Sequence, residues 1–177
     1  PLRKDPASIG RNERFTPQEA AYWQIRRYQL QYENDRFVKF LENLSNDAVD
    51  PLGMDEGCYD PVDGKIRCRA GSASFWATWD GYLLPCGMMT EPKVDMDDGD
   101  FFKAWGKLIK VTQQIRLSGI CTKCKNQGIC HACAAMALAE NGEFGKIPEY
   151  LCEMMAEMKK IAADANKIYG IQECLDI

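Results

Sequence analysis

The chain has 177 residues, with 22 basic and 26 acidic side chains and a formal net charge of -4. This length can bury one ordinary core, and the slight acidic excess gives no reason to expect a nucleic-acid or membrane surface. No apolar run approaches the roughly 20 residues of a membrane span, and the first residues, Pro-Leu-Arg-Lys-Asp-Pro, resemble no signal peptide and include no initiator Met. We therefore expect a cytoplasmic protein and a piece of a longer chain.

The first 45 residues predict an arm followed by a helix. Residues 1–15 are polar and basic with Pro and Gly breaks, which is typical of a linker. Thr16 then provides an N-cap, Pro17 suits the first helical position and Glu19 completes a capping box. Apolar residues continue at helical spacing until Ser45-Asn46-Asp47 ends the stripe: Tyr22, Ile25, Tyr28, Tyr32, Phe37, Phe40, Leu41 and Leu44. We expect this stripe to pack in the core.

A β-hairpin is predicted between two cysteines. The segment 46–69 is loop-like and carries Cys58 and Cys68, and alternating aromatic residues follow at 74–79. Asp80-Gly81 suits a tight type I′ turn before Tyr-Leu-Leu at 82–84 and Cys86. Folding the hairpin back on itself would bring Cys68 and Cys86 to the same end.

Three further helices are predicted around a dense cysteine cluster. An acidic stretch at 91–100 lacks the Glu that a calcium loop needs at its twelfth position, so we interpret it as solvated residues ending in an N-cap at Asp100. An amphipathic helix follows and ends near Gly119. After the cysteine-rich loop, a short apolar helix over 131–139 ends at Asn141-Gly142, and a last helix starts near Pro148 and carries Cys152.

Nine cysteines are far more than a chain of this size usually carries: 58, 68, 86, 121, 124, 130, 133, 152 and 174. Disulfides, zinc and iron–sulfur clusters are three competing explanations. The odd number argues against a disulfide framework. Close Cys-x-x-Cys pairs instead bring two thiolates to one metal centre, where backbone N–H groups stabilise their charge.

The order and spacing of the cysteines resemble a known family. Cys68, Gly81 and Cys86 are followed by Cys121-x2-Cys124-x5-Cys130-x2-Cys133 and then by Cys152. This pattern, with Cys68-Arg-Ala-Gly and Asp80-Gly81-x3-Pro85-Cys86, is similar to the seven-cysteine SPASM motif of radical S-adenosylmethionine (SAM) enzymes. The resemblance covers roughly residues 58 to 155.

The resemblance implies two auxiliary [4Fe–4S] clusters. Auxiliary cluster I would be held by Cys58, Cys68, Cys86 and Cys133, and auxiliary cluster II by Cys121, Cys124, Cys130 and Cys152. A cubane takes one thiolate per iron, so eight ligands serve two clusters and Cys174 is surplus. The family usually has three residues between the last two central cysteines, whereas only two lie between Cys130 and Cys133. Cluster I could therefore be open to a substrate ligand.

The radical-generating part is missing from this sequence. No three cysteines have the Cys-x3-Cys-x2-Cys spacing that binds the SAM-cleaving cluster of the superfamily. The resemblance therefore implies that residues 1–45 are a linker arm and N-terminal helix leading from a missing radical SAM barrel, and that 46–177 form the twin-cluster domain. SAM and a third [4Fe–4S] cluster would belong to the missing part. We expect an α+β fold, mostly helical, with a small β-hairpin and cysteine-rich loops around two metal clusters.

The implied function is electron transfer and substrate engagement in a radical SAM peptide or protein maturase, from a bacterial and anaerobic source. Gly87 follows Cys86 where sulfatase-maturating relatives carry an Asp, so a thioether or carbon–carbon crosslink is favoured over formylglycine formation. The partners would be the peptide or protein substrate, the missing barrel and an external electron donor or acceptor of flavodoxin or ferredoxin type, with no nucleic acid and no membrane. The alternative is a non-enzymatic zinc-binding interaction module.

The remaining candidate residues are better explained by structure than by chemistry. His131, the one histidine, is interpreted as a surface residue at a helix start. Three tryptophans, Trp76, Trp79 and Trp105, could line a substrate channel, but aromatic residues on a hairpin and an amphipathic helix are expected in the core. The pairs Met88-Met89 and Met154-Met155 are likewise expected to pack.

Overall fold

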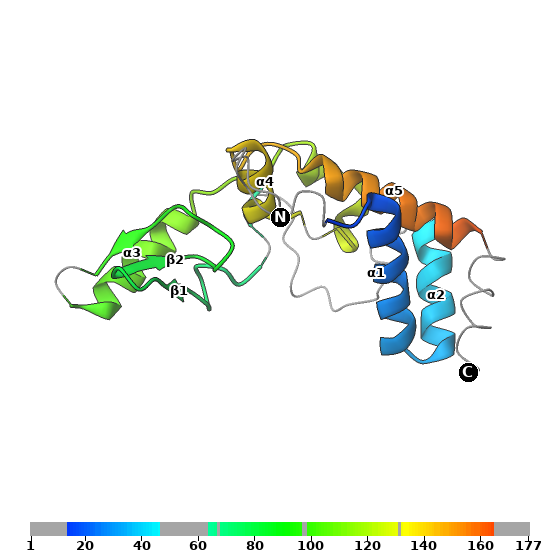
Figure 1. Cartoon of the computed structure of the whole chain (residues 1–177), viewed down its shortest axis with the longest axis horizontal. Coiled ribbons are helices and arrows are strands. Elements are labelled where there is room, and N and C mark those ends of the chain that lie inside the picture. Colours follow the sequence, from blue (N-terminus) through cyan, green and yellow to red (C-terminus); the bar gives the residue numbers. More distant parts are fainter. Residues whose placement is uncertain (1–13, 47–63, 67, 97–98, 131, 165–177) are drawn as a thin grey trace. The chain divides into compact units, whose positions relative to one another are not determined.

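The computed structural model describes residues 14–46, 64–66, 68–96, 99–130 and 132–164. These residues form an α+β fold with five α-helices and one three-stranded antiparallel sheet, so the predicted fold class is confirmed at this level (Figure 1). None of these helices is both long and apolar enough to cross a membrane.

The chain divides into two compact units made of alternating segments. Of the described residues, the sheet unit contains 64–66, 68–96, 99–122 and 132–148. The helical unit contains the described parts of Gly10–Glu56, Lys123–His131 and Glu149–Ile177. The cysteine-rich loop is thus shared between the units.

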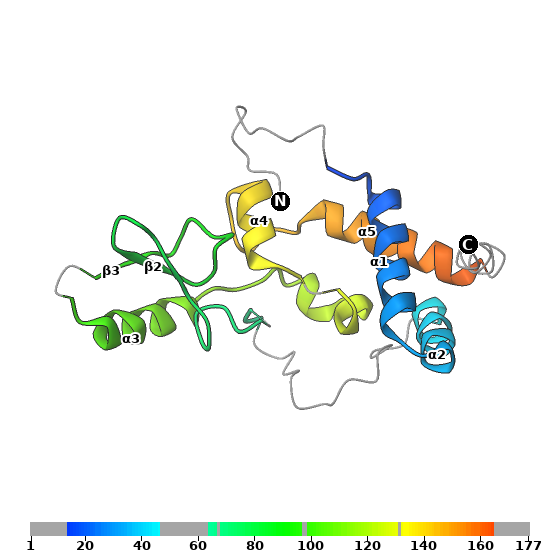
Figure 2. The ribbon, with the colours of Figure 1, turned by 60° about the horizontal axis from the view of Figure 1, so that its bottom comes forward.

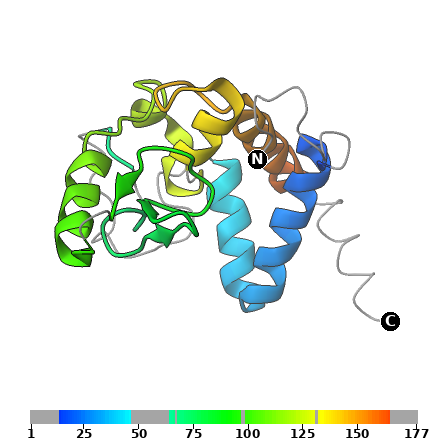
Figure 3. The ribbon, with the colours of Figure 1, turned by 60° about the vertical axis from the view of Figure 1, so that its left-hand side comes forward.

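Three helices build the helical unit: α1 (Pro17–Gln31), α2 (Asn34–Ser45) and α5 (Glu149–Ala163). The capping box predicted at the start of α1 is confirmed: Glu19 N–H donates to Thr16 Oγ1 at 3.2 Å, and Thr16 N–H donates to the Glu19 carboxylate at 2.8 Å. Both α1 and α2 pack against α5, and the two form a hairpin (Figure 3).

The apolar stripe predicted for one segment is divided between two helices. Tyr32 and Glu33 adopt extended backbone, with ψ near 147° and 151°, and Glu33 becomes the N-cap residue of α2. No Gly or Pro marks this break; Asn34 and Asp35 are the local signal, because short polar residues favour the first turn of a helix. The break lets Tyr28 stack on Tyr32 and contact Phe40, with ring centroids 5.7 and 4.8 Å apart.

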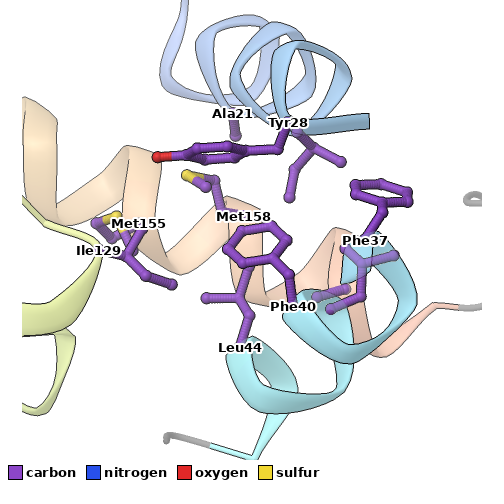
Figure 4. Packing of buried hydrophobic residues seen from close by; sticks show 11 residues of the cluster. Ala21, Tyr28, Phe37, Phe40, Leu44, Ile129, Met155 and Met158 are labelled. Atoms are coloured by element: carbon purple, nitrogen blue, oxygen red, sulfur yellow. The ribbon is translucent and has the colours of Figure 1, made fainter. Parts of the chain in front are cut away.

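The expectation that the stripe is core packing is confirmed for its central residues. Phe40, Leu44 and Ile25 are fully buried, and they meet Met155 and Met158 of α5 (Figure 4). Burying one such side chain contributes about 1.5–3 kcal/mol. Ile129, from the cysteine-rich loop, joins the same cluster and anchors that loop to the helical unit.

The sheet unit contains the predicted hairpin, with a different turn. Strands β1 (Trp76–Ala77) and β2 (Tyr82–Leu84) pair antiparallel, with Ala77 opposite Leu83. Gly81 N–H donates to Thr78 O at 3.3 Å and Gly81 has φ +89°, so a β-turn with Trp79-Asp80 at its centre precedes a left-handed glycine. The prediction of a two-residue Asp80-Gly81 turn was therefore wrong. The observed loop has three residues, 79–81, and ends in a glycine bulge at Gly81.

A third strand, β3 (Val94–Asp95), lies in the stretch that we interpreted as solvated and acidic. Val94 pairs with Leu83 and packs near Leu108 of α3 (Phe101–Thr112), which lies along β2 and β3 (Figure 2). Val94 and Met96 alternate with Lys93 and Asp95, and both pack against the cluster that contains Leu83. The strand was not predicted because this period-two pattern is only two apolar residues long and lies in an acidic stretch. The expected N-cap is confirmed: Lys103 N–H donates to Asp100 Oδ1 at 3.0 Å.

The short apolar helix after the cysteine loop is α4 (Ala134–Asn141). Gly142 ends it with a left-handed φ of 75°, as predicted, and its N–H donates to Leu138 O. The helix starts at Ala134 rather than at residue 131, and Cys133 is its N-cap residue.

The core prediction was wrong for two tryptophans and one methionine. Trp76 and Trp79 are 55% and 98% exposed, and Met88 is also exposed. Trp76 lies opposite Leu84 and so on the other face of the sheet from Leu83, which packs against α3. The helix Phe101–Thr112 packs on the face that carries Leu83, so Trp76 lies on the opposite face and is exposed. Trp105 is half-buried against Phe75 and Phe101, and Met89 and Met155 are buried as expected.

Candidate metal centre

The two ends of the hairpin are joined beside Cys68 and Cys86. Gly71, three residues after Cys68, donates its N–H to Ser74 O at 2.8 Å and to Pro85 O at 3.1 Å. Pro85 directly precedes Cys86, so the chain around the two cysteines is tied together at the base of the hairpin. Cys68 is exposed and Cys86 is half-buried.

Gly71 is required at this base by its conformation and by its surroundings. Its φ is +67°, and a Cβ on it would come within 2.6 Å of Thr112 Cγ2 and 2.7 Å of Thr112 Cβ. The chain passes this closely over the end of α3 because position 71 has no side chain. Gly71 belongs to the Cys68-Arg-Ala-Gly segment, but sequence reasoning assigned it no role.

Cys86 and Cys133 pack against the same small apolar cluster of the sheet unit. Its buried residues are Met89, Ile115, Leu117, Ala134 and Ala135. Cys86 lies in the turn where Met89 N–H donates to Cys86 O at 3.1 Å, and Cys133 lies at the start of α4, where Ala137 N–H donates to Cys133 O at 3.0 Å. Free N–H groups at the start of a helix can donate to the sulfur of a metal-bound cysteine.

Asn126 organises the loop between Cys124 and Cys130. Its N–H donates to Cys124 Sγ at 3.4 Å, while its carbonyl oxygen accepts from Cys130 N at 2.7 Å and from Ile129 N at 3.1 Å. The helix η3 (Lys125–Gly128) therefore closes one tight turn between the two cysteines. An N–H···S bond stabilises a thiolate ligand. Sequence reasoning missed this residue, since an Asn inside a Cys-x5-Cys spacer carries no specific signal.

The surroundings of this loop combine positive charge with an apolar base. Lys123 and Lys125 flank Cys124 in the chain. Cys130 packs against the apolar cluster that holds Ile129. The side-chain oxygen Oδ1 of Asn126 is buried and accepts no hydrogen bond within the described part of the chain.

Cys152 and Cys121 lie on other elements. Cys152 is exposed in the first turns of α5, in the helical unit with Cys124 and Cys130. Close by in sequence, Tyr150 Oη donates to Phe15 O at 3.0 Å, and its ring lies 3.3 Å from the Arg14 guanidinium carbon. This contact fixes the start of α1 against the start of α5. Cys121 begins the short helix η2 (Cys121–Lys123) and belongs to the sheet unit.

The structure brings the predicted ligands together only in part. Among the residues that it describes, no group of three or more His, Cys, Asp and Glu side chains could hold a metal ion. Cys58, Cys174, His131 and the arm before residue 14 lie outside those residues. The two predicted ligand sets thus stay predictions. Metal binding and folding are coupled in such sites, because the complete ligand set rarely forms before the metal binds.

The donor set nevertheless fits iron–sulfur clusters. Thiols from separate elements pack beside apolar clusters, and one of them already accepts a backbone N–H. Comparison with known proteins adds no relative: no family model, no curated protein and no solved structure matches the chain.

Proposed function

We propose that this chain is the SPASM-type auxiliary-cluster region of a radical SAM enzyme that modifies a peptide or protein. The observation that carries the proposal is the order of seven cysteines from Cys68 to Cys152, with a hairpin glycine between the first two. A chance pattern would have to reproduce this order and every spacing except the one between Cys130 and Cys133. Gly81 also has the left-handed backbone that the end of the hairpin loop requires, with φ +89°.

Three features of the sheet unit support auxiliary cluster I. Cys68, Cys86 and Cys133 all belong to this unit. Gly71 ties the chain after Cys68 to the residue before Cys86, and Cys133 packs on the same apolar cluster as Cys86. Cys58 would complete the set. The apolar cluster would exclude water from one side of the site, which raises the strength of electrostatic interactions there.

Three ligands proposed for auxiliary cluster II belong to the helical unit: Cys124, Cys130 and Cys152. The Asn126 turn holds the first two in one loop, and its N–H donates to Cys124 Sγ. Ile129 inserts into the core beside Cys130 and fixes the loop to the helices. Cys121, on η2, would be the fourth ligand.

The proposed role is electron transfer combined with substrate engagement. Bound clusters would supply one-electron redox chemistry. When a substrate radical forms a new thioether or carbon–carbon bond, one electron and one proton have to leave. The cysteine loops of this chain would hold the acceptors for that electron, and a flavodoxin- or ferredoxin-type protein would take it onward. SAM cleavage and its own cluster would belong to the barrel.

The ligand sets can be tested by three single substitutions in anaerobically reconstituted protein. Wild type should bind about eight iron and eight sulfide per chain, since each cubane takes four thiolates. Cys133→Ala and Cys124→Ala should each lower the iron content by about half, and the double variant should bind almost none. Cys174→Ala is the matched control, because it removes a thiol that belongs to neither set, and it should retain all the iron.

Two results would contradict the proposal. An equal loss from Cys174→Ala would show that iron binding does not follow the predicted sets. If Cys133→Ala and Cys124→Ala together lose no more iron than either alone, the two cysteines serve one site, and the assignment to separate clusters is wrong.

A further inference from the structure

The three-stranded sheet has two edges that differ in chemistry. The strand order is β1-β2-β3, so β1 and β3 are both edge strands. The β3 edge carries Glu91, Pro92, Lys93 and Asp95, whereas residues 70–79, which lead into and out of β1, include no charged side chain and no proline. Proteins protect exposed edges from pairing with lysine, proline and charge. The β1 edge lacks this protection.

The backbone of Ala77 points to the open edge. Thr78 N–H donates to Tyr82 O at 2.8 Å, so these two residues form a hydrogen-bonded pair. Bonded and non-bonded pairs alternate in an antiparallel ladder, which makes Ala77 and Leu83 a non-bonded pair. The N–H and C=O of Ala77 therefore face away from β2. An added strand could form two hydrogen bonds with this residue.

Aromatic side chains lie at both faces of this edge. Trp76 is 55% exposed on one face, and its indole lies over Gly87, where a Cβ would come within 3.2 Å of two ring carbons. Phe75 points to the other face and contacts Phe101 and Trp105, with ring centroids 5.2 and 5.1 Å away. Side chains of an added strand would alternate between these two faces and meet an aromatic ring on each.

We propose that the β1 edge binds an extended, uncharged and apolar segment of the peptide or protein substrate by β-strand addition. Open backbone donors and acceptors fit an extended polypeptide, and the absence of charge from 70–79 fits an apolar segment better than an ionic one. The bound segment would run past Trp76 and Gly87, and Gly87 follows Cys86. The identification of the partner as the substrate rests on the function proposed above. The inference that the edge binds an extended, apolar peptide does not depend on that function.

The test uses phage-displayed random dodecapeptides selected on the reconstituted full chain, followed by synthesis of the enriched sequences. Selected peptides should alternate apolar residues with period two and lack charge. Ala77→Pro should weaken their binding at least tenfold, because proline removes the outward N–H, while the β1–β2 hydrogen bonds do not involve that group. In wild type, peptide binding should slow amide exchange at 75–79.

The matched control is Asp95→Pro, which makes the same substitution on the other edge. Leu83 and Val94 form the bonded pair between β2 and β3, so the Asp95 N–H also faces outward. Asp95→Pro should leave peptide binding unchanged. Trp76→Ala should weaken it several-fold, because the aromatic contact on one face is lost while the backbone bonds remain.

Several outcomes would overturn the proposal: no peptide is enriched, Ala77→Pro binds as tightly as wild type, or Asp95→Pro weakens binding equally. A dimer in light scattering that Ala77→Pro converts to monomer would assign the edge to a second copy of the chain instead. Iron content of the wild-type chain separates this proposal from the proposed function. Wild type with normal iron content that enriches no peptide overturns the edge proposal alone, whereas wild type that binds the selected peptides but takes up no iron overturns the proposed function alone.

Discussion

Gly71→Ala should lower the free energy of unfolding of the sheet unit by about 2–5 kcal/mol. An alanine in the left-handed region costs about 1–2 kcal/mol, and Gly71 has φ +67°. Its Cβ would also overlap the Thr112 side chain, with separations of 2.6 and 2.7 Å to Cγ2 and Cβ. Forcing a methyl group into a packed site costs a further 1–3 kcal/mol or so.

Two further variants separate these contributions. Gly81→Ala also places alanine at positive φ, but nothing lies within 4 Å of the new Cβ, so it should lose about 1–2 kcal/mol only. Thr112→Ala in the Gly71→Ala background should recover part of the steric cost, because it removes Cγ2 and the hydroxyl but keeps Cβ, which would lie 2.7 Å from the new Cβ. The hydroxyl is buried and makes no hydrogen bond with the described residues, so its removal breaks none. The double-mutant cycle should therefore give a coupling below the full steric cost of about 1–3 kcal/mol.

The assay is guanidinium denaturation followed by tryptophan fluorescence, with iron content measured on the same samples. Because Gly71 joins the chain around Cys68 and Cys86, Gly71→Ala should also reduce the iron retained at auxiliary cluster I. The reasoning is refuted if Gly71→Ala costs no more than Gly81→Ala, or if Thr112→Ala recovers nothing in the double variant.

Three other predictions follow from local geometry. Gly106→Ala should stabilise α3 by about 1 kcal/mol in the same denaturation assay, because the new Cβ meets nothing within 4 Å; a loss would contradict this. Hydrogen bonds from Thr16 hold the pKa of Glu19 below its ordinary value. The Glu19 carboxylate should therefore contribute its full share of stability above pH about 4.3 and lose it as the pH falls through the lower folded-state pKa. The difference in melting temperature between wild type and Glu19→Ala should accordingly become smaller at low pH. A difference that does not change with pH would contradict this prediction. Asn126→Pro should lower iron content by about half, since it removes the N–H···S bond to Cys124, whereas Asn126→Ala should retain all the iron. Equal losses would assign the effect to the side chain.

Local end signals predicted several helix termini correctly, but the expected end near Gly119 was wrong, because α3 ends at Thr112. Thr16 and Glu19, Asp100 and Gly142 act within a few residues, and the structure has each of them in the predicted role. Such signals depend on backbone groups at a helix terminus that need a nearby partner, which the sequence displays directly. The α+β class followed from adding these elements to one hairpin.

Features that depend on distant packing were not predicted. The break at Tyr32 exists because α1 and α2 both pack against α5, which is more than 100 residues away. Trp76 is exposed because α3 covers the opposite face of a small sheet, and no local pattern specifies which face a helix will cover. Strand β3 depends on its partner Leu83 rather than on its own composition.

For the candidate site, the family resemblance implied which cysteines would share a cluster, and that grouping stays a prediction. The contacts of Gly71 and Asn126 had no signal of their own in the sequence. A hydrogen bond from a backbone N–H to a sulfur needs only a turn of the right shape, which many residue types could supply. The position of Cys133 at the start of α4 likewise had no specific signal in the sequence.

The central claim is tested most directly by the iron, acid-labile sulfide and zinc content of the anaerobically reconstituted wild-type chain, measured together with its visible absorption spectrum. We predict about eight iron and eight sulfide per chain, no zinc and the broad visible absorption of cubane clusters. One or two zinc ions in a colourless protein that takes up no iron would contradict the account and identify a structural zinc module.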